Sequence, residues 1–367
     1  MFNKNFIDIM KLICVFISFT ITLHSIAQNN KDLAYEKATT AISLMDKGMY
    51  NESIGILKES QKLDPTNILY SYEIAYAYYC MKEYKKTIKI LKPHTNHTDA
   101  NDQYFQLLGN CYDYIGKPQK ALLVYNYGLT KFPKSGKLYL EKGNVYWGQQ
   151  QYNRALKMYE SGIEADPFFP SNYYRAALLY CNSQNPVWGM IYGEIFMNLE
   201  TKTKRTSEIS KLLFKTYTNQ ISFNKDSILQ VSFCKNFSIS ENQFEDSSKH
   251  IKIPFCSLYE RTILSSLDSK KNIDIQQLHT MRQNFIKHYF ESDFHSIYPV
   301  VLFDFQKMVY EAGHLEAYNY WILSLYNKEI LTNWIQENQQ KWNEFEMWFN
   351  QNHLPLNSEN AFYSKKY

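Results

Sequence analysis

The side chains of this chain that could hold a metal ion gather in its C-terminal half. Four of its histidines cluster there, at His279, His288, His295 and His314. His288 and His295 are about two helical turns apart, so one continuous helix would place both imidazoles on the same face. Glu291, Ser292 and Asp293 lie between them and are more typical of a helix end, and the spacings of known zinc sites are missing. We therefore predict no metal site and no cofactor.

The sequence also lacks the motifs of common enzymes. It contains no phosphate-binding P-loop, no dinucleotide glycine pattern, no nucleophile elbow and no zincin motif. Glu260, Arg261 and Glu316 are isolated charges in expected helices, more typical of surface positions or buried ion pairs than of acid–base catalysts. We predict a non-enzymatic protein with no catalytic residue. The alternative is a hydrolase-like or ligand-binding module in the C-terminal region, which a pocket grouping several of the histidines with Glu316 would favour.

The cysteines do not form a disulfide framework. Five of them follow residue 27, at Cys80, Cys111, Cys181, Cys234 and Cys256. An odd number at such wide spacing does not indicate a disulfide-rich fold. The first three fall in expected helices, where cysteine packs as a small apolar side chain. Cys234 and Cys256 flank an irregular segment and either pair in an oxidising compartment or stay free, because spacing alone does not fix their distance.

Composition favours helices and disfavours a nucleic-acid partner. The chain has 12 glycines and 10 prolines but 31 tyrosines and 23 phenylalanines, which suits a mostly helical protein with aromatic packing. Its net charge of +4 is small for 367 residues. The densest basic stretch, residues 202–215, contains Glu208 and indicates a solvated helix face. We therefore predict no nucleic-acid binding.

The N-terminus has the pattern of an export signal. Lys4 and Lys11 precede an apolar run over residues 12–23, and Ser25-Ile26-Ala27 follows as a small-x-small cleavage site. We predict a cleaved signal peptide over residues 1–27 and a location in the periplasm or outside a bacterial cell. An uncleaved anchor is the alternative. No later segment reaches the ~20 apolar residues of a membrane span, so no integral membrane segment is expected after cleavage.

The elements that must position any binding surface recur at a fixed interval. The segment Gly109–Tyr112 returns thirty-four residues later as Gly143–Tyr146. Counting in both directions places repeat starts at residues 34, 68, 102, 136 and 170. The eighth position of the repeat is always small, at Ala41, Ala75, Gly109, Gly143 and Ala177. A small side chain is expected there because the first helix of each pair crosses the second closely.

This pattern resembles the tetratricopeptide repeat (TPR) family over residues 34–201. The resemblance implies a right-handed superhelix of antiparallel helix pairs, whose concave groove holds a peptide or a partner's surface. In this family, positions two, five, nine, twelve and thirteen of the first helix usually face the groove. The residues that fill such positions here include Tyr72, Tyr76, Tyr79, Gln106, Asn110, Asp113, Leu140, Asn144, Trp147 and Tyr174.

Some of these residues allow both a binding and a packing interpretation. The amides of Asn110 and Asn144 would clamp an extended peptide backbone, or asparagine is simply common at this point of the repeat. The tyrosines of the second repeat either pack between helices or, where exposed, anchor a partner. A clamp for a terminal carboxylate, which a related subfamily builds with lysines, is not expected, because Gln106 stands where a lysine would be needed.

After the array, we expect a capping helix within residues 202–220 and a mainly helical domain over 221–367. Alternation at Leu229, Val231 and Phe233 predicts a strand, and residues 251–253 are its expected partner. Helices are expected over residues 257–268, 274–291, 297–312, 315–326 and 328–351. The stretch Gly313–Trp321 resembles C-terminal regions of secreted bacterial TPR proteins of unassigned activity.

These patterns predict a mostly α protein, in which a TPR solenoid of about five helix hairpins is followed by a smaller helical domain with a short β-hairpin. The resemblance implies an exported, non-enzymatic scaffold that binds a protein or peptide partner in its concave groove. Besides the hydrolase-like alternative, a subunit buried along its whole length in a cell-envelope assembly also fits the sequence.

Overall fold

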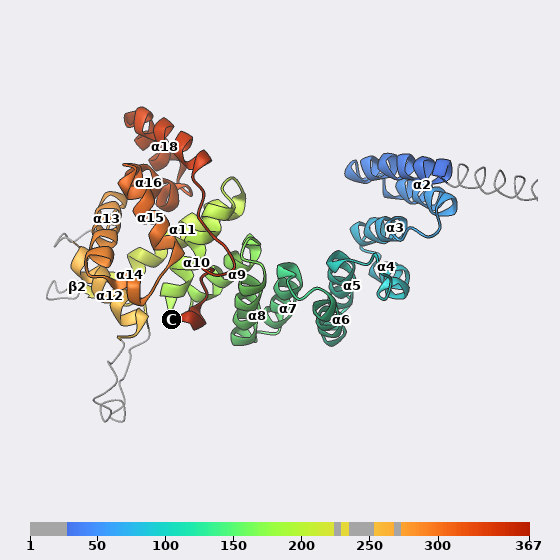
Figure 1. Ribbon diagram of the computed structural model, residues 1–367, viewed down its shortest axis with the longest axis horizontal. Helices are drawn as coiled ribbons and strands as arrows, with labels where there is room; N and C mark the ends of the chain where they lie inside the picture. Colours follow the sequence, from blue (N-terminus) through green and yellow to red (C-terminus); the bar gives the residue numbers. More distant parts are fainter. Residues whose placement is uncertain (1–27, 224–228, 235–252, 268–272) are drawn as a thin grey trace, which may run out of the picture. The chain divides into compact units, whose positions relative to one another are not determined.

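A computed structural model describes residues 28–223, 229–234, 253–267 and 273–367 (Figure 1). The predicted signal peptide lies outside the described residues. The chain divides into two compact units, one ending at Phe132 and the other running from Pro133 to Tyr367. They are called unit 1 and unit 2 below.

Five helix pairs follow one another, as the TPR pattern predicts. Unit 1 holds a helix over residues 28–46 with α2 (Tyr50–Leu63), then α3 (Leu69–Cys80) with α4 (Tyr84–Leu91), and α5 (Asp102–Tyr114) with α6 (Pro118–Lys131). Unit 2 begins with α7 (Gly136–Gly148) and α8 (Tyr152–Ala165), followed by α9 (Pro170–Tyr180) and α10 (Pro186–Leu199). In the last four pairs the first helix begins within one residue of the predicted repeat start. The predicted fold class is therefore confirmed.

The small residues of the repeat let the two helices of a pair touch. A Cβ atom added to Gly109 would lie 2.1 Å from the ring of Tyr125, and one added to Gly143 would lie 2.2 Å from the ring of Tyr159. Both tyrosines are fully buried. Each ring thus lies against bare backbone of the facing helix, which no larger side chain would allow.

A left-handed residue closes the turn inside each of the first four pairs. Gly48, Lys82, Gly116 and Gln150 have φ angles of 78°, 61°, 72° and 59°. They are thirty-four residues apart and occupy the fifteenth position of each repeat. In the fifth pair, the described turn residues 181–185 include no such angle. The fifth repeat therefore keeps its two helices but departs from the shared turn.

The rest of unit 2 begins with a cap and a short hairpin. Helix α11 (Lys204–Gln220) starts at a capping box built by Thr203 and Thr206. Strand β1 (Ile221–Phe223) then pairs antiparallel with β2 (Leu229–Val231). The sequence did not identify β1 as a partner of β2. The expected partner was residues 251–253, of which 251 and 252 lie outside the described residues. Alternation over three residues identifies a strand but not its partner.

Seven helices are described beyond the hairpin: α12 (Phe255–Ser266), α13 (Ile275–Glu291), α14 (Phe294–Ile297), α15 (Val301–Glu311), α16 (Leu315–Ser324), α17 (Lys328–Glu337) and α18 (Gln339–Gln351). Gly313, at φ 79°, ends α15 as predicted. The expected helix over 328–351 is in fact two, because Asn338 leaves the helical region at φ −129° and ψ 36°. A 3-10 turn, η3 (Ser364–Lys366), closes the chain.

One continuous core joins the repeats of unit 2 to the helices that follow. Its buried residues run from Ala155 in α8 to Phe362 in the C-terminal tail. The C-terminal tail is bound to the fourth repeat, because the Ser364 hydroxyl donates a hydrogen bond to Glu160 of α8. Tyr192 of the fifth repeat donates to the same carboxylate, at 2.7 Å. The domain limits at residues 201 and 220 remain a prediction, and this core extends across both.

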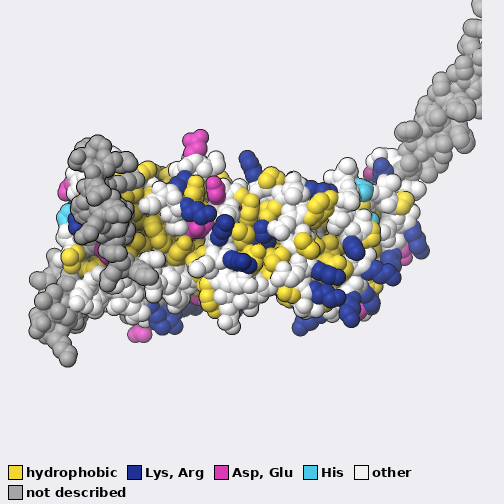
Figure 2. All heavy atoms as spheres, turned by 90° about the horizontal axis from the view of Figure 1, so that it is seen from below, with side chains coloured by type: hydrophobic (Ala, Val, Ile, Leu, Met, Phe, Trp, Pro, Cys, Tyr) yellow, Lys and Arg dark blue, Asp and Glu magenta, His cyan; other side chains and the backbone are white. Residues whose placement is uncertain are grey.

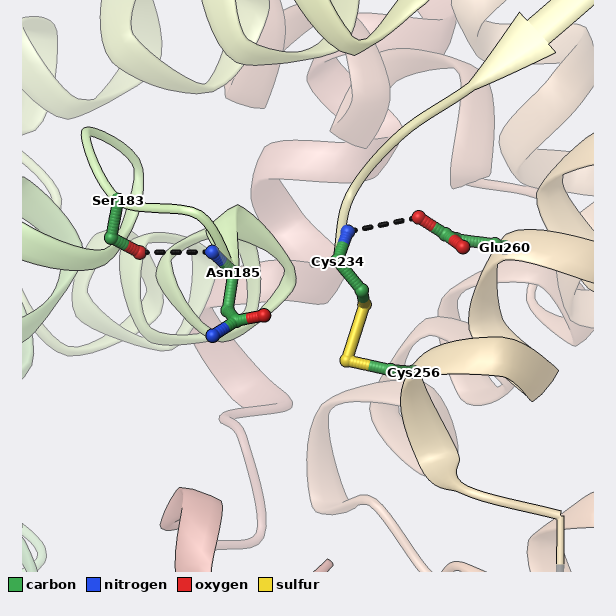
Figure 3. The surroundings of a disulfide bond; sticks show 5 residues. All are labelled: Ser183, Asn185, Cys234, Cys256 and Glu260. Carbon is green, nitrogen blue, oxygen red and sulfur yellow. Dashed lines mark hydrogen bonds between the residues drawn. A yellow bond between two sulfur atoms is a disulfide. The ribbon is translucent and has the colours of Figure 1, made fainter. Parts of the chain in front are cut away.

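Cys234 and Cys256 form a disulfide that ties the end of the hairpin to α12 (Figure 3). Their Cα atoms are 5.9 Å apart, within the usual range for a bridge. The Cys234 amide also donates to Glu260 at 2.8 Å, and burial raises the pKa of that carboxyl. Cys80, Cys111 and Cys181 are free thiols.

Candidate partner-binding faces

Six tyrosines from three helices form a connected aromatic cluster in unit 1, called here the tyrosine face: Tyr72, Tyr76, Tyr79, Tyr84, Tyr104 and Tyr114. Tyr104 is buried, and the other five are at least partly exposed. Along α3, the rings of Tyr72, Tyr76 and Tyr79 are stacked with centroids 6.4 Å and 6.2 Å apart. Tyr104 of α5 lies 4.9 Å from Tyr72, while Tyr84 and Tyr114 close the other end at 5.1 Å from each other. Residues from two successive repeats therefore share one surface.

Among the described residues of unit 1, five of the nine exposed large hydrophobic side chains lie at positions that face the groove in TPR arrays; the other four are Leu33, Met49, Leu123 and Tyr127. Tyr35 and Leu69 at position two are 66% and 38% exposed, and Ile42 and Tyr76 at position nine are 37% and 41% exposed. Tyr114 at position thirteen is 58% exposed. Large apolar side chains in water along one side of successive helices are typical of a surface that a partner covers.

The charged groups that act on Tyr72 and Tyr104 are acidic. Burial, followed by the charges of Glu73 and Asp102, raises the pKa of Tyr72. Burial and Glu73 also raise the pKa of Tyr104, with a further contribution from Asp99. Glu73 is half-buried, and burial raises the pKa of its carboxyl. Among the described residues, none of the ion pairs includes Glu73.

The predicted polar groove residues of unit 1 lie on α5. Gln106, Asn110 and Asp113 are each half-buried. The Asn110 carbonyl oxygen accepts a hydrogen bond from the Tyr125 hydroxyl at 2.5 Å. Asn110 thus helps to hold Tyr125, the tyrosine that packs on Gly109. This is the packing role, which the sequence alone did not distinguish from peptide binding.

Asn144 has the same role in unit 2. Its carbonyl oxygen accepts from the Tyr159 hydroxyl at 3.1 Å, and its amide donates to Glu141 at 3.0 Å. Leu140 packs against the core of unit 2. These two predicted groove residues are therefore engaged within the chain.

The aromatic groove residues of unit 2 are covered by the chain's own arginines. The Arg175 guanidinium lies 5.2 Å from the centroid of Trp147 and 5.8 Å from that of Tyr174. Arg205 lies 5.0 Å from Tyr174 on α9, and the Tyr174 hydroxyl donates to Glu208 at 2.7 Å. Cation–π contacts of this kind are attractive. In unit 2, the predicted binding aromatics thus already have cationic partners.

The four C-terminal histidines do not share a pocket. His279 lies beside Asn319 at 3.1 Å, and His288 lies 3.3 Å from both Ser265 and Ser266. His295 is 3.6 Å from Asp293, and α13 ends before both residues, as expected from the sequence. Within the described residues, no three His, Cys, Asp or Glu side chains are grouped as metal ligands.

His314 and Glu316 also have partners elsewhere. His314 contacts the ring of Trp348, with centroids 5.5 Å apart, and Glu316 pairs with Lys341 at 2.7 Å. The Glu316 charge acts on the pKa of His279, whereas the contacts described for the other three histidines are to different residues. The grouping of several histidines with Glu316 that would favour a hydrolase-like module is therefore not formed by the described side chains.

The sequence did not reveal a buried polar network around Glu194 of α10. Arg282 of α13 donates to both Glu194 carboxylate oxygens, at 2.5 Å and 2.8 Å, and both side chains are almost completely buried. The hydroxyl of Tyr318 and the amide of Gln306 donate to the same carboxylate. Burial alone would lower the pKa of Arg282, but the Glu194 charge holds it well above the ordinary value.

A small cavity adjoins this ion pair. It is lined in part by Glu194, Arg282, Tyr217 and Tyr259 and has a volume of about 20 Å³. That volume holds about one water molecule and no organic substrate. The network therefore serves to join α10 to the helices that follow the array.

Two comparisons found no similar protein: no protein-family model matches the chain, and no curated protein matches it. Solved structures resemble about half of the chain. PilF of Pseudomonas aeruginosa is 14% identical, with 52% of this chain and 86% of that chain covered at a TM-score of 0.44. The TPR protein TTC0263 of Thermus thermophilus is 14% identical, with 49% and 98% covered at 0.42. PilW, a type IV pilus biogenesis factor, is 16% identical, with 50% and 84% covered at 0.42.

The chain's own helix pairs, in thirty-four-residue register, define it as a TPR solenoid followed by further helices. No helix among the described residues is long and apolar enough to cross a membrane.

Proposed function

We propose that this protein is an exported, non-enzymatic scaffold that binds a polypeptide partner through the groove side of its TPR array. The observation that carries the proposal is the exposure of Tyr35, Ile42, Leu69, Tyr76 and Tyr114 at groove positions of three successive repeats. Rigid, amphipathic tyrosine side chains are common anchors in protein interfaces because they bury a large area at a small cost in conformational entropy.

Unit 1 is the primary contact in this proposal. Tyr72, Tyr76 and Tyr79 form the centre of the surface, and Gln106 and Asp113 provide polar groups beside it. In unit 2, the predicted residues Leu140, Asn144, Trp147 and Tyr174 are occupied by contacts within the chain. These residues would contribute to partner binding only if contacts with the partner replaced their contacts within the chain.

Export is supported by the Cys234–Cys256 bridge, because disulfides persist in oxidising compartments and are rare in the cytosol of most organisms. The N-terminal pattern over residues 1–27 agrees with this location. The mass of the secreted protein tests export: cleavage after Ala27 leaves a chain that begins at Gln28, and recovery of the full-length chain from the cytosol would count against it.

The binding proposal is tested by site-specific crosslinking in the native cell. A photoreactive residue at Tyr76 should capture a discrete protein partner. A matched probe at Tyr152, which is 47% exposed but lies at the start of α8 outside the groove positions, should not. Equal labelling at both positions, or none at Tyr76, Tyr114 and Tyr35, would contradict a specific interface on this side of unit 1.

A further inference from the structure

The tyrosine face combines aromatic rings with a carboxylate that has no ion-pair partner among the described residues. Glu73 lies on α3, between Tyr72 and Tyr76 in the sequence. Its charge contributes to raising the pKa of both tyrosines. It is half-buried, which costs free energy for an ionised carboxylate unless a cation compensates it. Within the described ranges, no lysine or arginine forms an ion pair with Glu73 or a cation–π contact with Tyr72 or Tyr76.

This negative charge is local and does not follow from the composition. The whole chain has a net charge of +4. On the face drawn in Figure 2, Lys and Arg side chains are frequent and acidic ones are sparse. By contrast, the charges that act on Tyr72 and Tyr104 come from Glu73, Asp99 and Asp102.

Unit 2 illustrates how such aromatic positions bind a cation. Trp147 and Tyr174 occupy groove positions, and Arg175 lies within 6 Å of both ring centroids, at 5.2 Å and 5.8 Å. Arg175 is the sixth residue of its repeat, and the sixth residue of the second repeat is Glu73. The fifth repeat thus supplies a cation to one aromatic residue of the fourth repeat and one of its own, whereas the second repeat has an anion at the corresponding position.

We infer that the tyrosine face binds an arginine-containing segment of its partner, with a guanidinium lying on the rings of Tyr72 and Tyr76 and pairing with Glu73. This deepens the proposed function by naming the chemistry of the bound segment, and it rests on that function. Arginine fits better than lysine because its planar, weakly hydrated guanidinium stacks on aromatic rings while donating to a carboxylate. The bound cation would offset the cost of burying Glu73.

The test uses the full mature chain and four fluorescent peptides that alternate Gly-Ser with arginine, lysine, glutamine or glutamate. Fluorescence anisotropy at low and at physiological salt gives the affinities. We expect the arginine peptide to bind most tightly and the glutamate peptide least. Replacing arginine by lysine should weaken binding less than replacing it by glutamine, because the charge remains.

Four variants locate the contact. Tyr76→Leu and Glu73→Gln should each weaken binding of the arginine peptide by about two- to thirty-fold. Tyr76→Phe keeps the ring and should bind nearly as the parent does. Tyr152→Leu removes an exposed tyrosine at another site and should change nothing. Circular dichroism of each variant shows that the helices are retained.

The outcomes separate this inference from the proposed function. If the glutamine or glutamate peptide binds as tightly as the arginine peptide and Tyr76→Leu still weakens it, the face binds peptides but the choice of a cationic segment is wrong. If Glu73→Gln leaves the preference for arginine intact, the assigned contact is also wrong. If no peptide binds and the Tyr76 crosslink captures no protein in cells, both proposals fail.

Discussion

Lys82 and Gln150 hold backbone angles that glycine adopts more easily. Their φ values of 61° and 59° are left-handed, and Gly48 and Gly116 occupy the same position of the first and third repeats. A side chain costs about 1–2 kcal/mol in this region, while glycine costs about 0.4–1 kcal/mol through the entropy of the unfolded chain.

We therefore expect Lys82→Gly and Gln150→Gly each to raise the free energy of unfolding by up to about 1 kcal/mol. Urea unfolding followed by circular dichroism measures this change. Gly116→Ala is the reverse control: an added Cβ would meet no atom within 4 Å, so any loss of stability must come from the backbone. If both glycine variants lower the free energy of unfolding, the side chains of Lys82 and Gln150 stabilise the fold by more than their left-handed backbone angles cost.

Gly143 is required for a different reason, the approach of Tyr159. Its replacement by alanine places a Cβ 2.2 Å from the ring, so the helices of the fourth pair must separate. We expect Gly143→Ala to lower the free energy of unfolding of unit 2 by about 1–3 kcal/mol, as overpacking does. Gly55→Ala, in an exposed turn of α2 with nothing within 4 Å of the new Cβ, should instead be neutral or stabilising. Equal effects at both sites would contradict the packing explanation.

At the residue scale, the sequence predicted packing better than it predicted binding. Gly109 and Gly143 were found because both copies are glycine at the same interval. The left-handed turn was missed because Lys82 and Gln150 interrupt the glycines that would have marked it. Whether Asn110 packs or binds could not be decided, since its partner Tyr125 comes from a facing helix fifteen residues away.

At the level of elements, the disulfide secures the hairpin to α12. In the chain-entropy picture, a bridge across a sequence separation of 22 stabilises by roughly 3 kcal/mol. We expect Cys234→Ser with Cys256→Ser to lower the thermal midpoint, and dithiothreitol to lower that of the parent to the same value. Dithiothreitol should leave the double variant unchanged. Mass spectrometry of an unreduced digest should find the two cysteine peptides linked; two separate peptides from the exported protein would show that the bridge is absent.

Element boundaries were predictable where a strong local signal exists. Helix starts in the array followed from the repeat interval, and the end of α15 followed from Gly313. The break at Asn338 did not, because apolar residues continue at helical spacing on both sides of it. The partner of β2 was also missed, since pairing with Ile221–Phe223 depends on where α11 ends and not on the alternation itself.

At the scale of the whole molecule, a buried ion pair links the fifth repeat of the chain, which lies in unit 2, to the helices that follow it. Glu194 and Arg282 are 88 residues apart in sequence. In the sequence alone, neither residue differs from the other charged residues of the chain. No local pattern contains such a contact. The hydrophobic core of unit 2 likewise runs from α8 to the tail.

We expect Arg282→Met to lower the free energy of unfolding of unit 2 by about 3–5 kcal/mol, because Glu194 would remain buried without its cation. Replacing both, as Glu194→Leu with Arg282→Met, should recover much of that loss, since no charge then remains in the core. Thermal unfolding of the single and double variants measures the difference. A double variant no more stable than Arg282→Met would contradict this explanation, because removing the stranded Glu194 charge would then have recovered nothing.

The shared position of the left-handed turn has a consequence for chain length. Since helix start, glycine contact and turn all return at the same interval, one whole repeat is the natural unit of insertion or deletion. Excising residues 102–135 would rejoin the chain in phase and keep every remaining hairpin intact. Losing only part of that segment would separate Gly109 from the ring of Tyr125 or leave one helix of the third pair without its partner, so homologous chains should vary in size by complete modules.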